Sequence, residues 1–137
     1  MTPPRKKLVH TEAIPIRWGD MDAMGHVNNT AYFRYMEQAR ISWFDALGVR
    51  PSPQGAGPVI INASCTFIKQ LVYPGVVEGR TDGGKVGNSS FETWLEMRPG
   101  YDPGTLYAEG AAKVVWVDFQ QGKSTALPEK IRQIVLG

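Results

Sequence analysis

The chain has 137 residues, a typical length for one domain, of which 42% are hydrophobic and 20% charged. Its formal net charge of +2 and its scattered basic residues exclude the strongly basic surface of a nucleic-acid-binding protein. It contains no apolar run of the roughly 18 residues that a membrane-spanning helix needs, and no apolar segment of a secretory signal follows the N-terminus. We therefore expect one cytoplasmic domain over residues 1–137, with no nucleic-acid or membrane partner and a frayed tail over residues 1–7.

The cysteine and histidine content limits the possible chemistry further. The single cysteine, Cys65, cannot form an internal disulfide or a cysteine-rich metal site, and it lies in an apolar run that favours a buried, inert thiol. The two histidines, His10 and His26, lack the spacing of metal ligands. We therefore expect no metal site, and a reducing compartment fits this composition.

The N-terminal part of the chain predicts a short strand, a loop and a long helix. Ile14–Trp18 alternates between apolar and polar side chains, and the proline inside it favours an edge strand. Gly19–Val27 is rich in Gly, Asp and Met, which is typical of a loop. A helix is expected from about residue 30 to residue 47, because two asparagines that make good N-caps precede it and a glycine follows it.

This helix is apolar over much of its circumference. A helix of that kind is expected to be buried in a core rather than to lie on a surface. The apolar face consists of Tyr32, Tyr35, Met36, Ala39, Trp43, Ala46 and Leu47, and it is widened by Phe33, Ile41 and Phe44.

The rest of the chain predicts at least four strands and a short helix. The strands are expected at Val59–Val72, Val76–Val86, Ser89–Met97 and Thr105–Phe119, and the helix from Pro128 to about Val135. A long sheet with one hydrophobic helix must bury that helix on its concave face. The predicted class is α+β, with an antiparallel sheet wrapped around one long helix.

The loop before the long helix carries the side chains that could perform chemistry. Two carboxylates, Asp20 and Asp22, and one imidazole, His26, precede the first turn of the helix. The first N–H groups of a helix have no internal partner, and this first turn has no acid to occupy them. They could therefore polarise the oxygen of a ligand, while an upstream carboxylate acts as a base or nucleophile toward the same carbonyl.

The same residues also have a purely structural interpretation. Asp and Asn commonly form turns and caps in loops, and a histidine before a helix more often packs or caps than catalyses. Physical arguments from the sequence do not distinguish Asp20 from Asp22. No Gly-x-Ser-x-Gly elbow, P-loop or Rossmann glycine pattern offers another site.

The loop and helix resemble the 4-hydroxybenzoyl-CoA thioesterase family of hotdog proteins, and the resemblance covers most of the chain. The matching residues in the loop and helix are Asp20, Asp22, Gly25, Val27, Tyr32, Tyr35, Glu37, Ala39 and Arg40. Later matches are Phe67, Tyr73-Pro74-Gly75, Gly87-Asn88-Ser89-Ser90-Phe91, Val114-Val115-Trp116-Val117-Asp118 and Pro128. The resemblance implies a hotdog fold that hydrolyses an acyl thioester, with CoA as part of the substrate and no separate cofactor.

The resemblance also implies roles for individual residues. The catalytic carboxylate of the family corresponds to Asp22, and the main-chain N–H that polarises the thioester carbonyl corresponds to Asn29. Ser90 matches a serine that lines the CoA side of the pocket. Basic residues flank that serine in some members but not here, and their place could be taken by Lys85, Lys113 or Lys123. A homodimer or homotetramer is implied, with the site at an interface where the two sheets continue into one another.

Several alternatives remain open. Plant acyl-carrier-protein thioesterases share a similar His-Val-Asn-Asn run in which the histidine has been considered functional. His26 is therefore a further candidate for a catalytic residue, and acyl carrier protein is an alternative to CoA. A non-catalytic acyl-CoA-binding module on the same fold would need no carboxylate near the carbonyl. A dehydratase or hydratase on this fold would use a histidine, for which His26 is the candidate, together with an acid.

Overall fold

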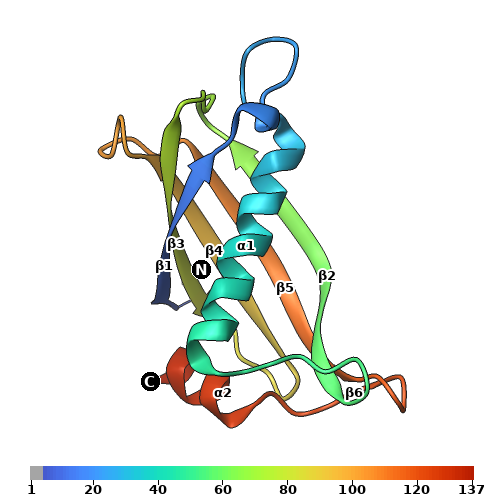
Figure 1. Cartoon of the computed structure of the whole chain (residues 1–137). Coiled ribbons are helices and arrows are strands. Elements are labelled where there is room, and N and C mark those ends of the chain that lie inside the picture. Colours follow the sequence, from blue (N-terminus) through green and yellow to red (C-terminus); the bar gives the residue numbers. More distant parts are fainter. Residues whose placement is uncertain (1–4) are drawn as a thin grey trace.

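The computed structural model describes residues 5–137 as an antiparallel sheet with a long helix lying across one face (Figure 1). The elements in chain order are β1 (Lys6–Ile16), the 3-10 helix η1 (Trp18–Asp20), α1 (Asn29–Leu47), β2 (Ala56–Phe67), β3 (Gly75–Gly84), β4 (Ser90–Pro99), β5 (Ala108–Asp118), β6 (Lys123–Ser124) and α2 (Glu129–Leu136). The predicted class, α+β with an antiparallel sheet around one long helix, is confirmed.

The sheet has the strand order β1-β3-β4-β5-β2, and the short β6 pairs with β5. All of these pairs are antiparallel. β1 and β2 are therefore the two edge strands, and each leaves one row of main-chain groups without a strand partner in this chain. Pro15 lies in β1, so the prediction that its strand occupies an edge is correct.

The first strand is longer than its sequence predicts. Of the run Ile14–Trp18, only the part up to Ile16 belongs to β1, which begins at Lys6 and pairs with β3 from Lys6↔Gly84 to Ile16↔Gly75, and Trp18 begins η1. The expected tail over residues 1–7 is therefore wrong for Lys6 and Lys7, while residues 1–4 lie outside the described residues. The first half of β1 is largely polar, so its pairing with β3, and not its own propensity, makes it a strand.

The other boundaries differ by a few residues, most clearly in the run Val59–Val72. β2 ends at Phe67, and residues 68–74 leave the ladder to connect β2 to β3. The ends of α1 agree with the prediction. The Asn28 side chain accepts a hydrogen bond from the Thr30 N–H, and Gly48 ends the helix in the left-handed conformation, with φ of 71°.

Only one face of α1 is buried against the sheet. The expectation of a helix buried on most of its circumference is wrong, because the added apolar residues Phe33 and Ile41 are exposed in this chain. A sheet on one side can cover only one stripe of a helix. The buried residues of α1 are Ala31, Tyr32, Tyr35, Met36, Ala39, Trp43 and Phe44.

The core under α1 divides into two hydrophobic clusters. One contains Tyr35 and Met36 near the start of α1, and the other contains Trp43 and Phe44 near its end, where α2 packs. Arg40, which follows Ala39 on α1, is half-buried, and this burial lowers the pKa of its guanidinium. The first cluster supports the end of α1 that bears the candidate site.

Within the described part of the chain, no helix is long and apolar enough to cross a membrane.

Candidate active site

The loop between η1 and α1 folds back on itself as a small hairpin at one end of the molecule (Figure 1). Gly25 takes a φ of 77° at its tip, in the left-handed region that favours glycine. Two main-chain hydrogen bonds hold its two arms together: the Asn28 N–H donates to the Asp20 carbonyl and the Asp22 N–H donates to the His26 carbonyl, both at 2.8 Å, which makes Met21 and Val27 an antiparallel bridge. The loop is thus ordered by its own hydrogen bonds.

Asp22 is an exposed residue, and only one of its two carboxylate oxygens accepts hydrogen bonds from residues 5–137. Its Oδ1 atom accepts hydrogen bonds from the Met24 N–H at 2.9 Å and from the His26 N–H at 3.4 Å. Its other oxygen, Oδ2, accepts none from residues 5–137. One oxygen therefore fixes the side chain on the loop, and the other is free to meet a substrate or a water molecule.

Asp20 is in a different environment. Its Oδ2 atom accepts hydrogen bonds from the Arg17 N–H at 2.9 Å and from the Tyr35 hydroxyl at 2.7 Å. Burial, with the hydrogen bond to Asp20 as a second cause, raises the pKa of Tyr35, so this hydroxyl remains a neutral donor. Asp20 thus ties η1 to α1, and the two acids, which physical arguments from the sequence left equivalent, have different hydrogen-bond partners.

The first N–H of α1 is also free. Asn28 occupies the neighbouring donors, because its side chain accepts from the Thr30 N–H at 3.0 Å and its carbonyl accepts from the Ala31 N–H at 2.9 Å. The Asn29 N–H donates to no group of the described residues, and the first turn contains no acid. An unpaired donor at the positive end of the helix dipole is suited to an oxygen that becomes negatively charged.

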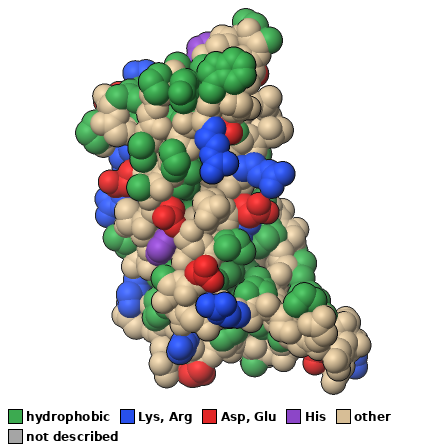
Figure 2. Space-filling model, in the orientation of Figure 1, with side chains coloured by type: hydrophobic (Ala, Val, Ile, Leu, Met, Phe, Trp, Pro, Cys, Tyr) green, Lys and Arg blue, Asp and Glu red, His purple; other side chains and the backbone are tan. Residues whose placement is uncertain are grey.

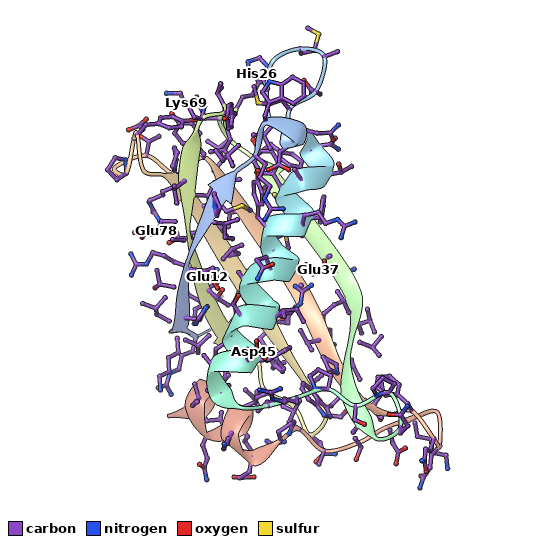
Figure 3. All side chains as sticks on the ribbon, in the orientation of Figure 1. Glu12, His26, Glu37, Asp45, Lys69 and Glu78 are labelled. Carbon is purple, nitrogen blue, oxygen red and sulfur yellow. The ribbon has the colours of Figure 1, made fainter. Side chains whose placement is uncertain are left out.

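His26 lies in the same loop, above the start of α1 (Figure 3). Its main chain completes the hairpin with Asp22, but its ring forms no hydrogen bond or ion pair with residues 5–137. Asp22, His26 and Asn29 therefore share one loop–helix junction. Asp22 has defined hydrogen-bond partners, and Asn29 has a free main-chain N–H. No contact of the described residues indicates a role for the His26 imidazole.

The connection between β2 and β3 holds this loop from the side. Leu71 is fully buried; its carbonyl accepts from the Val27 N–H at 2.9 Å, and its N–H donates to the Tyr32 hydroxyl at 3.1 Å. The Tyr73 N–H approaches the Met21 sulfur at 3.4 Å. Sequence reasoning missed this support, because contacts between segments far apart in the chain leave no local pattern.

Large apolar side chains are exposed on the loop and on η1, which precedes it. Trp18 is 77% exposed and Met24 is 79% exposed. Hydrophobic side chains gather at this end of the molecule in the space-filling view (Figure 2). Exposed apolar groups on both sides of a free carboxylate are typical of a surface that a ligand or a second subunit covers.

A groove of about 580 Å³ lies between β1 and the first half of α1. Asp20 and Tyr35 are among its lining residues, but Asp22, His26 and Asn29 are not. This groove therefore lies beside the hydrogen bond between Asp20 and Tyr35 and not beside Asp22. The candidate site itself is open and is not enclosed by this one chain.

Ser90 and Lys85 lie at the opposite end of the sheet. Ser90 begins β4, whereas the loop with Asp22 lies beyond the end of β1, which pairs with β3 at Ile16↔Gly75. The ten residues of β4 span about 30 Å at the usual rise per residue. Lys85 follows β3 with a φ of 47°, and its Nζ atom lies 3.1 Å from Glu92 Oε2. A single chain therefore does not bring these two residues to Asp22.

Two further observations concern metal ligands and the single cysteine. No group of three or more His, Cys, Asp or Glu side chains within residues 5–137 is arranged to hold a metal ion. Burial raises the pKa of the Cys65 thiol to about 11, so little of the reactive thiolate is present near neutral pH.

Comparisons with known proteins identify the class. The antiparallel sheet wrapped around one long helix is the hotdog fold of the thioesterases. Residues 16–135 match the model of the Thioesterase-like superfamily, and the chain belongs to this superfamily.

Individual relatives agree with this assignment. PA2801 of Pseudomonas aeruginosa, a candidate thioesterase, is 40% identical with a TM-score of 0.90, over 94% of this chain and 99% of its own. The BH1999 gentisyl-coenzyme A thioesterase is 25% identical with a TM-score of 0.80, over 92% of this chain and 99% of its own. YsmA of Bacillus subtilis (strain 168) is 24% identical over 128 residues, which is 90% of this chain and 82% of YsmA. YsmA is an uncharacterized protein, and the two solved structures, which are described as thioesterases, support thioester hydrolysis as the reaction class.

Proposed function

We propose that this protein is an acyl-CoA thioesterase of the 4-hydroxybenzoyl-CoA thioesterase type, which converts an acyl-CoA and water to a free acid and CoA. The observation that carries the proposal is the pairing of two free groups at one loop–helix junction. These groups are the Asp22 Oδ2 atom and the Asn29 N–H at the start of α1. A non-catalytic binding module would need the donor but not the carboxylate.

The mechanism follows from these two groups. The thioester carbonyl oxygen accepts a hydrogen bond from the Asn29 N–H, which stabilises the negative charge that develops on that oxygen. Asp22 either attacks the carbonyl carbon or removes a proton from a water molecule that attacks it. The C–S bond then breaks and CoA leaves as the thiolate, which takes up a proton. If Asp22 is the nucleophile, water hydrolyses the resulting anhydride and regenerates the carboxylate.

A homodimer would complete the site. We expect two copies to pair antiparallel along β2, the edge strand on which Ile61 and Phe67 are exposed. A two-fold axis there would place the end of one sheet that carries Ser90 beside the end of the other sheet that carries Asp22. The Ser90 hydroxyl and the Lys85 ammonium of one copy would then contact the CoA whose thioester lies at Asp22 of its partner. A homotetramer would be two such dimers.

The proposal is tested with a panel of acyl-CoAs and a reagent that detects the released thiol, with acyl-carrier-protein thioesters in parallel. We expect multiple turnovers on at least one acyl-CoA. The protein's own thiol, Cys65, can add at most one equivalent and so does not imitate turnover. Binding of acyl-CoA without thiol release would support the binding module instead. Turnover of acyl-carrier-protein thioesters alone would show that the substrate carrier is acyl carrier protein and not CoA.

A further inference from the structure

The turn between β3 and β4 is held from behind by the C-terminal helix. The Arg132 Nη2 atom, on α2, donates to the Gly87 carbonyl at 3.0 Å and to the Asn88 carbonyl at 2.8 Å. The Leu127 N–H, just before α2, donates to the same Asn88 carbonyl at 3.0 Å. Two successive carbonyls of the turn are therefore directed toward the C-terminal segment.

While these carbonyls accept hydrogen bonds from the C-terminal segment, other groups of the turn remain free to donate. The Asn88 and Ser89 N–H groups donate to no group of residues 5–137, and neither does the Ser90 hydroxyl. Lys85 lies at the start of the turn, where its Nζ atom is paired with Glu92 Oε2 at 3.1 Å. Successive free N–H groups are suited to an anionic ligand. Carbonyl oxygens directed the same way would repel that ligand.

Arg132 is carried by a firmly packed element. Ile131 and Val135 of α2 are buried in the hydrophobic cluster at the end of α1. On the same helix, the Lys130 Nζ atom donates to the Leu47 carbonyl at 3.2 Å, at the end of α1. Because α2 is fixed by this packing, the hydrogen bonds from the Arg132 guanidinium also fix the position of the turn.

We propose that Arg132 is a positioning residue for recognition of the CoA nucleotide, and that α2 serves as the brace for this function. The inference rests on the proposed function, because it takes the turn with Lys85 and Ser90 as the CoA-binding segment. Arg132 acts through the turn and contacts no substrate. Its loss frees the Gly87 carbonyl and leaves the Asn88 carbonyl on the Leu127 N–H alone. The donors of the turn then no longer hold one orientation toward the phosphates. The chemistry at Asp22, at the other end of the sheet, is unaffected.

The test compares two substrates with the same acyl group, the best acyl-CoA of the panel and its N-acetylcysteamine thioester, which lacks the nucleotide. Arg132→Met should raise KM for the CoA thioester by about tenfold, the scale of one lost hydrogen bond to a charged group, with little change in kcat. KM and kcat for the N-acetylcysteamine thioester should stay within about twofold of wild type. Arg132→Lys, which keeps the charge but has a single donor group, should be intermediate.

Lys130→Met is the matched control, since it removes a cation from the same helix that does not touch the turn. Its KM for the CoA thioester should stay within about twofold of wild type, because the buried Ile131 and Val135 still hold α2 in place. An unchanged KM in Arg132→Met, an equal loss on both substrates, or the same loss in Lys130→Met would each overturn the inference. Failure of wild type to hydrolyse either thioester would instead refute the proposed function, so the two failures are distinguishable.

Discussion

Asp20 and Asp22 are two residues apart, and their hydrogen-bond partners indicate a structural role for Asp20 and a catalytic role for Asp22. Asp22→Asn keeps the shape of the side chain and removes its charge. We expect kcat to fall by at least about a hundredfold, the scale of general base catalysis, with KM nearly unchanged because the carboxylate acts on the transition state. Steady-state kinetics on the best acyl-CoA, with circular dichroism as a folding control, measures this. A folded Asp22→Asn variant with wild-type kcat would refute the mechanism.

His26→Ala is the comparison within the same loop. Its ring has no partner in the described residues, so we expect a loss of about tenfold or less in kcat, from altered loop geometry rather than lost acid–base chemistry. If His26→Ala abolishes turnover while Asp22→Asn does not, the histidine-based alternative replaces the proposed one.

Asp20 should matter for stability more than for rate. Asp20→Ala removes the acceptor of the Arg17 N–H and of the hydroxyl of Tyr35, a residue that is only 4% exposed as a whole. An unpaired buried hydroxyl costs about 1–3 kcal/mol. Chemical denaturation should show this loss in Asp20→Ala and largely spare Asp22→Asn. An equal loss in both would mean that the loop tolerates neither change and that the structural distinction is wrong.

At the scale of elements, the sequence was informative wherever a structure depends on nearby residues. α1 could be predicted from the helical spacing of its apolar residues, from the N-cap Asn28 and from Gly48, and the candidate acids from their place before it. The first half of β1 could not, because its polar residues become a strand only by pairing with β3. The contacts of Leu71 and Arg132 were equally out of reach, since each joins segments that are distant in the sequence.

The start of β1 gives a test of that argument. Lys6 pairs with Gly84, its Nζ atom lies 4.0 Å from Glu109 Oε1, and the same atom lies 4.5 Å from the centroid of the Trp94 ring. Deleting residues 1–7 should therefore lower the Tm by about 2–5 °C relative to deleting residues 1–5, because one cation–π contact and two strand pairs are lost. Differential scanning calorimetry of the two truncations decides this. Equal Tm values would show that Lys6 and Lys7 contribute nothing to the strand.

At the scale of the whole molecule, the two edges of the sheet are expected to behave differently. We expect wild type to be a dimer or tetramer at micromolar concentration by light scattering. Ile61→Lys places like charges at the shared β2 edge and should shift the mass toward the monomer, with loss of activity. Leu8→Lys makes the same change at an exposed position of the other edge strand, β1, and should leave mass and activity unchanged. A monomeric, active wild type would contradict the interfacial site.

The shared site also makes a quantitative prediction about mixed dimers. Asp22→Asn removes the carboxylate, and Ser90→Trp blocks the CoA-binding turn, so each variant alone should be nearly inactive. If each site combines Asp22 of one copy with the turn of its partner, every mixed dimer contains one intact site. Random exchange of subunits at equal concentrations makes half of the dimers mixed, and activity should recover to about a quarter of wild type. If both groups instead act within one chain, every site carries a defect and no activity returns, whatever the mixing ratio. The recovered fraction, followed with the thiol assay after subunit exchange, thus shows whether the two ends of the sheet meet across two copies.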